Sequence, residues 1–103
     1  MKLYYKLVRD KIPDIIAATG ARCTIRMLAD KEYIEELDAK LQEELDEYHD
    51  SHNVEELADL LEVIYAAAAA QGVSAKELDA LRAEKAARRG RFEKRIFLRF
   101  VED

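Results

Sequence analysis

Two adjacent segments of the chain carry apolar residues at helical spacing, and a short polar break, HDSHN (49–53), separates them. The first segment, residues 30–49, has its apolar stripe at Ile34, Leu37, Leu41, Leu45 and Tyr48. The second segment runs from 54 to about 71 and has a comparable stripe over residues 57–64. Positions three and four apart share one face of a helix. The pattern therefore predicts an antiparallel helical hairpin.

Helix start and stop signals organise the rest of the chain. Pro13 suits the first turn of a short helix that stops at Gly20, and Ser74 with Glu77 forms a capping box for a helix that closes at Gly90. We predict an all-α fold, a helical bundle built on the hairpin, in a single domain over residues 1–103. Residues 22–28 and 95–101 are rich in β-branched or apolar side chains, so short strands are expected there.

Length and composition exclude several classes of protein. No apolar stretch is long enough to cross a bilayer, and the charged first residues do not resemble a signal peptide. A single cysteine, Cys23, cannot form an internal disulfide. We expect a cytoplasmic protein that does not associate with a membrane.

Charge is distributed unevenly. Residues 30–62 contain fourteen acidic residues against two lysines, whereas residues 82–99 contain eight basic residues against two glutamates. This pattern suits a site that holds both a cation and a polyanion. It equally suits two solvated helix faces that attract each other.

In an antiparallel hairpin, residues equidistant from the turn lie level with each other. Glu44 would then face Asp59, and Glu47 would face Glu56 one turn away. At about 100° per residue, all four acids emerge on one side of the hairpin. The same geometry points Glu43 away from its stripe into solvent, unless the helix is slightly rotated.

Four carboxylates held together repel, and a cation would offset that repulsion. An oxygen-only cluster favours a hard cation, Mg²⁺ or Mn²⁺, over zinc. The acids also have ordinary explanations. Glu56 stands where a capping glutamate belongs after Asn53, and Glu44 and Glu47 could be surface residues of a helix. Spacing alone leaves both interpretations open.

At these acids the sequence resembles the MazG-like nucleoside triphosphate pyrophosphohydrolases, in the branch similar to phosphoribosyl-ATP pyrophosphohydrolase. The family pattern is ExxE on one helix and ExxD on the next, which EELDE (43–47) and EELAD (55–59) match. The segments YKLVRDKIPDII, EELADLLEVIYA and RRGRFEKRIFL extend the resemblance over almost the whole chain. Only eight residues separate Glu47 from Glu56, a shorter link than in many members of the family.

The resemblance implies an all-α, Mg²⁺-dependent hydrolase that cleaves a nucleoside triphosphate between its α and β phosphates to give a monophosphate and pyrophosphate. It implies Glu44, Glu47, Glu56 and Asp59 as metal ligands, and Glu44 and Glu47 as catalytic residues. Glu47 is our candidate for accepting the proton of the attacking water.

A phosphate chain also needs cationic partners. The candidates lie in two of the resembling segments and are Lys6, Arg9, Lys11, Arg89, Arg91, Lys94 and Arg95. For any one of them, a solvated surface charge is the more ordinary role, and the phosphate-binding role rests on their occurring as groups in the resembling segments.

Two other functions compete with hydrolysis. One is a non-enzymatic helical interaction protein in which the acidic hairpin pairs with the basic tail or with a partner. The other is nucleic-acid binding through residues 82–95, which the net charge of −5 argues against. Finally, the alanine run 66–70 suits a helix in the middle of a bundle or at a subunit interface. The resemblance implies assembly through the helices, so a dimer or tetramer of identical chains is expected.

Overall fold

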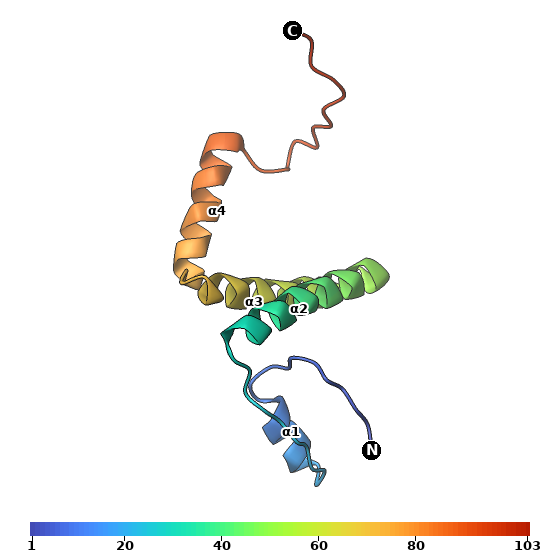
Figure 1. Cartoon of the computed structure of the whole chain (residues 1–103). Coiled ribbons are helices and arrows are strands. Elements are labelled where there is room, and N and C mark those ends of the chain that lie inside the picture. The colour runs from blue at the N-terminus through green and yellow to red at the C-terminus, as the bar shows by residue number, and fades with distance from the viewer.

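The computed structural model describes residues 1–103 and contains four α-helices and no β-strand. The helices are α1 (Ile12–Ala18), α2 (Asp30–Ser51), α3 (Val54–Ala70) and α4 (Ala75–Arg89). Figure 1 shows them in chain order, with the hairpin of α2 and α3 between the N-terminal and C-terminal parts of the chain. The predicted all-α fold class is confirmed.

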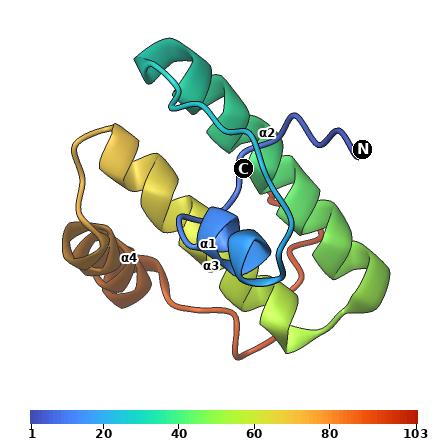
Figure 2. The same ribbon diagram turned by 90° about the horizontal axis from the view of Figure 1, so that it is seen from below.

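The hairpin forms because α2 and α3 are joined by a two-residue link. His52 adopts a left-handed backbone conformation, with φ of 54°, and its N–H donates to the carbonyl of Tyr48. Asn53 then caps α3, since its side chain accepts a hydrogen bond of 3.0 Å from the N–H of Glu55. The two helices lie side by side in both views (Figures 1 and 2).

Helix α4 leaves the hairpin at a sharp bend. The capping box predicted at its start is present: Ser74 accepts from the N–H of Glu77, and Glu77 accepts from the N–H of Ser74. Gly72 and Gly90 both have positive φ and end α3 and α4. The axes of α3 and α4 are bent by 105°, so α4 contacts α3 at one end only and does not touch α2.

The chain buries very little. The buried apolar residues are Leu37, Val63 and Ala68, and the one buried charged residue is Glu44. The radius of gyration is 18.2 Å, against about 13 Å for a compact chain of this length. Much apolar surface therefore lies open, most of all in the C-terminal arm, by which we mean residues 91–103.

The strands expected at 22–28 and 95–101 are not formed. A strand requires a neighbouring strand to satisfy its backbone groups, and these segments lie at opposite ends of the molecule (Figure 1). Arg95 also has φ of 58°, and its N–H closes a turn with the carbonyl of Phe92. The β-rich composition of both segments was thus a misleading signal.

No single helix is long and apolar enough to cross a membrane. Helices α3 and α4 reach the required length and composition only when they are taken together, across their 105° bend.

Candidate metal centre

The hairpin brings the four predicted acids together. Carboxylate oxygens of Glu44, Glu56 and Asp59 lie within 4.8 Å of one another, and those of Glu43, Glu44 and Glu47 form a second such group. Glu44 belongs to both groups and joins them. We call Glu44, Glu47, Glu56 and Asp59 the carboxylate cluster. It spans the two helices as the spacing of the acids predicted.

Glu44 is the centre of the carboxylate cluster. It is only 7% exposed, and its Oε2 atom is buried without a hydrogen-bond partner. The other oxygen, Oε1, lies 3.6 Å from the Nζ atom of Lys40. Burial, followed by the nearby carboxylate of Glu47, raises the pKa of Glu44. A buried, partly unpaired carboxylate is costly, and a bound cation would relieve that cost.

Glu56, a half-buried residue of α3, resembles Glu44 in having one carboxylate oxygen without a partner. Its Oε2 atom is also buried and unpartnered. Burial, then the charges of Glu47 and Asp59, raises its pKa. Its side chain does not cap α3, because the N–H of Asn53 donates to Ser51 Oγ instead. The capping explanation for Glu56 is therefore wrong, and the side chain is directed to the other acids.

Helix geometry predicted that Glu43 points into solvent, but in the structure its side chain contacts two lysines. Its two carboxylate oxygens lie 3.3 Å from the Nζ atoms of Lys6 and Lys40. Burial alone would raise the pKa of Glu43, but hydrogen bonds and charge from the two lysines lower it. Glu43 differs from the cluster because its charge is already balanced, and it forms the rim of the site.

The N-terminal segment supplies cations to the cluster. Arg9 Nη2 donates to Asp59 Oδ1 at 2.7 Å, and Lys6 contacts Glu43 as described. Lys11, the third candidate in this segment, precedes α1 and forms no ion pair. Two of the three N-terminal candidates therefore reach the site.

The C-terminal candidates do not reach the cluster within one chain. Arg89, Arg91, Lys94 and Arg95 line a hollow around the end of α4, together with Phe92. None of them forms an ion pair with the hairpin, and the arm extends away from it (Figure 1). The intramolecular pairing of acidic hairpin and basic tail, considered from the sequence, is not formed.

Sequence reasoning missed Lys40. This half-buried lysine lies within reach of both Glu43 and Glu44 and is the only cation of α2 in the site. Lys40 precedes Glu43 by three residues and Glu44 by four, and side chains at these two spacings lie next to each other on a helix. That spacing could have identified Lys40 from the sequence.

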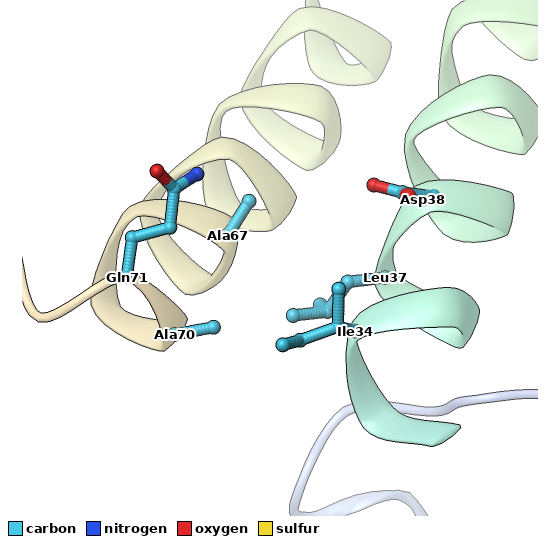
Figure 3. Close-up of a pocket in the computed structure, with 6 residues that line it drawn as sticks. All are labelled: Ile34, Leu37, Asp38, Ala67, Ala70 and Gln71. Carbon is cyan, nitrogen blue, oxygen red and sulfur yellow. The ribbon is translucent and has the colours of Figure 1, made fainter. Parts of the chain in front are cut away.

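A small cavity lies at the other end of the hairpin, where α2 begins and α3 ends (Figure 3). Its lining residues are Ile34, Leu37, Asp38, Ala67, Ala70 and Gln71. Its volume is about 60 Å³, whereas ligand pockets usually exceed about 300 Å³. It admits a few water molecules and is too small for a nucleobase.

Comparison with known proteins gives one partial match. The chain is 55% identical over 42 residues to an uncharacterized protein of Mycolicibacterium smegmatis. The match covers 41% of this chain and 43% of that protein, less than half of either. No protein-family profile matches the chain, and no solved structure matches it.

Proposed function

We propose that the chain is a Mg²⁺-dependent nucleotide pyrophosphohydrolase, which hydrolyses a ribo- or deoxyribonucleoside triphosphate between its α and β phosphates. The observation that carries the proposal is Glu44, a buried carboxylate with one unpartnered oxygen. The other three acids of the carboxylate cluster converge around it. The resemblance of EELDE and EELAD to the MazG-like pattern selects this reaction among those that a divalent cation can assist.

The donor set suits Mg²⁺ or Mn²⁺. The cluster offers only carboxylate oxygens, and the two buried unpartnered oxygens, Glu44 Oε2 and Glu56 Oε2, belong to different helices. Glu44, Glu47, Glu56 and Asp59 would hold the ion. When bound, it neutralises phosphate charge and lowers the pKa of a water molecule.

The protein groups then have separate roles. Glu47 is the exposed member of the cluster and forms no ion pair, so besides contributing to the metal site its carboxylate can accept a proton from the attacking water. The water oxygen bonds to the α phosphorus while the bond from that phosphorus to the bridging oxygen breaks. Pyrophosphate leaves, and the nucleoside monophosphate remains.

Arg9 and Lys6 are placed to bind the phosphate chain. Both already lie at the edge of the cluster, where they pair with Asp59 and Glu43. Their ion pairs are solvent-exposed and hence weak, so exchanging a carboxylate for a phosphate oxygen costs little. A guanidinium can contact two phosphate oxygens at once, which suits Arg9 for orienting the substrate.

The proposed enzyme works as a homo-oligomer, a dimer or a tetramer. A single chain buries only three apolar residues and leaves most of α4 and the arm uncovered. That is too small a core to make an isolated chain of this length stable.

The test is pyrophosphate release from a panel of canonical and modified nucleoside triphosphates, in Mg²⁺ and in chelator. The proposal expects release in Mg²⁺ only, with monophosphate formed in equal amount. A non-enzymatic interaction protein, the competing function, would release none from any member of the panel and would show no thermal stabilisation by Mg²⁺.

A further inference from the structure

The C-terminal arm has the composition of a packed segment, yet its large apolar side chains remain exposed. Phe92 is 97% exposed and Phe97 is 88% exposed, and Ile96, Leu98, Phe100 and Val101 are also exposed. Its cations Arg91, Lys94, Arg95 and Arg99 form no ion pair with any acid of the chain. Exposed apolar surface of this extent is typical of an interaction surface.

Helix α3 offers a matching surface. Val54, Leu57, Ala58 and Leu61 fall within about 100° of one another around the helix, and all are exposed. We call these four residues the open face of α3. The centre of this face lies more than about 100° around the helix from Ala67, which faces α2 (Figure 3).

The open face has an acidic edge. Glu55 and Glu62 lie along one side of it, are exposed, and form no ion pair. Asp59, from the carboxylate cluster, lies further around the helix on the same side. A segment that buried apolar side chains on the open face could therefore place its cations against this edge and beside the cluster.

The arm does not meet this surface in its own chain. Helix α4 turns away from α3 by 105°, and the arm continues away from the hairpin (Figure 1). We propose that the arm of one copy lies along the open face of α3 in a second copy, with its cations on the acidic edge of that copy.

The areas suit an exchange between two copies. Buried phenylalanines remove about 150–250 Å² each, so Phe92, Phe97 and Phe100 together would bury roughly 450–750 Å². A stable interface buries about 800 Å² per partner. In a two-fold dimer each copy gives one arm and receives one, so every such contact occurs twice. The exchange also cancels opposite charges that each chain leaves unpaired.

One consequence rests on the proposed function. The cations around Phe92, which a single chain keeps away from the carboxylate cluster, would border the cluster of the second copy. The phosphate-binding groups would then come from two chains, Arg9 and Lys6 from one and the arm from the other. The docking of the arm itself requires no enzymatic activity.

Crosslinking tests the docking directly. In a Cys23→Ser background, one tagged chain carries Leu57→Cys and a differently tagged chain carries Ile96→Cys, Phe97→Cys or Leu98→Cys. After the two chains are mixed at micromolar concentration, a short bismaleimide should join them at one arm position or more. Ile25→Cys, an exposed apolar position outside the proposed contact, replaces Leu57→Cys in the control and should give little product.

Two outcomes would overturn the proposal. The first concerns a third chain that carries Leu57→Cys and an arm cysteine together. If this chain crosslinks within itself while the two tagged chains do not crosslink to each other, the arm folds back on its own α3. The second is absence of any crosslink at all three arm positions. Neither outcome depends on pyrophosphate release, so the docking can fail while the proposed function stands, and the reverse.

A charge exchange gives a second measurement. Arg91→Glu with Arg95→Glu in one chain, or Glu55→Lys with Glu62→Lys in another, should each weaken self-association at least about tenfold in sedimentation equilibrium. An equal mixture of the two variants should recover association as a heterodimer. Unchanged association of both variants, or no recovery in the mixture, would contradict the pairing of arm and edge.

Discussion

The hairpin and the C-terminal arm leave different groups without partners: negative charge in the hairpin, and positive charge and apolar surface in the arm. The hairpin buries Leu37, Val63 and Ala68 but gathers negative charge around a buried Glu44. The arm carries unpaired positive charge and six large apolar side chains that remain exposed. Burial and charge balance are thus divided between two parts of one chain. The comparison separates the two ligands that we propose: a cation for the hairpin and a protein surface for the arm.

The largest expected effect concerns activity. Glu47→Gln removes the proposed proton acceptor, so pyrophosphate release in Mg²⁺ should fall about 100-fold or more. Glu35→Gln, an exposed acid on the same helix with no ion pair, is the matched control and should keep normal turnover. Equal rates for Glu47→Gln and the natural protein would remove Glu47 from the site.

Metal binding should stabilise the hairpin. A ligand at 100 times its Kd adds about 2.7 kcal/mol to the free energy of unfolding, so Tm should rise clearly in Mg²⁺ relative to chelator. The rise should be much smaller in a Glu44→Gln variant, which lacks the central carboxylate. A Tm that does not respond to Mg²⁺, Mn²⁺ or chelator would count against a metal centre.

Stability without metal should depend on pH in a defined direction. Glu44 and Glu56 have folded-state pKa values above their ordinary value of 4.5. Their contribution to stability is therefore complete below pH 4.5 and is lost as pH rises through the higher folded-state values. Glu43, whose pKa is lowered, acts in the opposite sense and loses its contribution as pH falls.

Thermal melts in chelator across pH 4–8 should separate these effects. The Glu44→Gln variant should lose much of the decline in Tm toward neutral pH, and Glu43→Gln should retain it. If the decline is identical in both variants, repulsion within the cluster is not its cause.

A smaller effect is expected when repulsion is relieved by Glu47→Gln in metal-free buffer. Relief of about 0.5 kcal/mol would raise Tm by roughly 2–4 °C in a chain of this size. Asp59→Asn relieves the same repulsion but loses the ion pair with Arg9, so its gain should be less. A lower Tm for Glu47→Gln in chelator would show that its carboxylate stabilises the apo protein.

The smallest effect concerns the exposed pair of Arg9 and Asp59. Arg9→Ala should lower the free energy of unfolding by about 0.5 kcal/mol in chelator, the usual scale for exposed ion pairs. Lys11→Ala, in the same segment but without an ion pair, is the control. A loss several times larger for Arg9→Ala would mean that the N-terminal segment fixes the hairpin more strongly than one exposed pair can.

The sequence predicted those parts of the structure that short-range interactions decide. Asn53 and the pair of Ser74 and Glu77 mark helix starts through hydrogen bonds to residues two or three positions away. The convergence of Glu44 and Asp59 followed from helical periodicity and a short link. Each of these depends on residues close in the chain or on a single helix pairing.

Other features of the structure depend on contacts between residues far apart in the chain, which helical periodicity does not predict. Glu43 is held by Lys6, 37 residues earlier, and no local pattern indicates that the N-terminal segment passes along α2. The strand composition of 22–28 and 95–101 was real, but pairing depends on where the two segments lie in space. The direction of α4 depends likewise on the turn between α3 and α4, where Gly72 has a positive φ, and the apolar stripes of the helices do not encode it.

The short link between α2 and α3 determines which residues of the two helices lie level with each other in the carboxylate cluster. With only His52 and Asn53 between the helices, Glu44 lies level with Asp59. A residue inserted within either helix, between its acids and the link, would shift those acids by about 1.5 Å along the axis and turn them by about 100° relative to the other helix. The convergence of the four carboxylates therefore depends on the phase of the two helices as well as on the identity of the acids. Such an insertion should separate the carboxylates without any substitution among them.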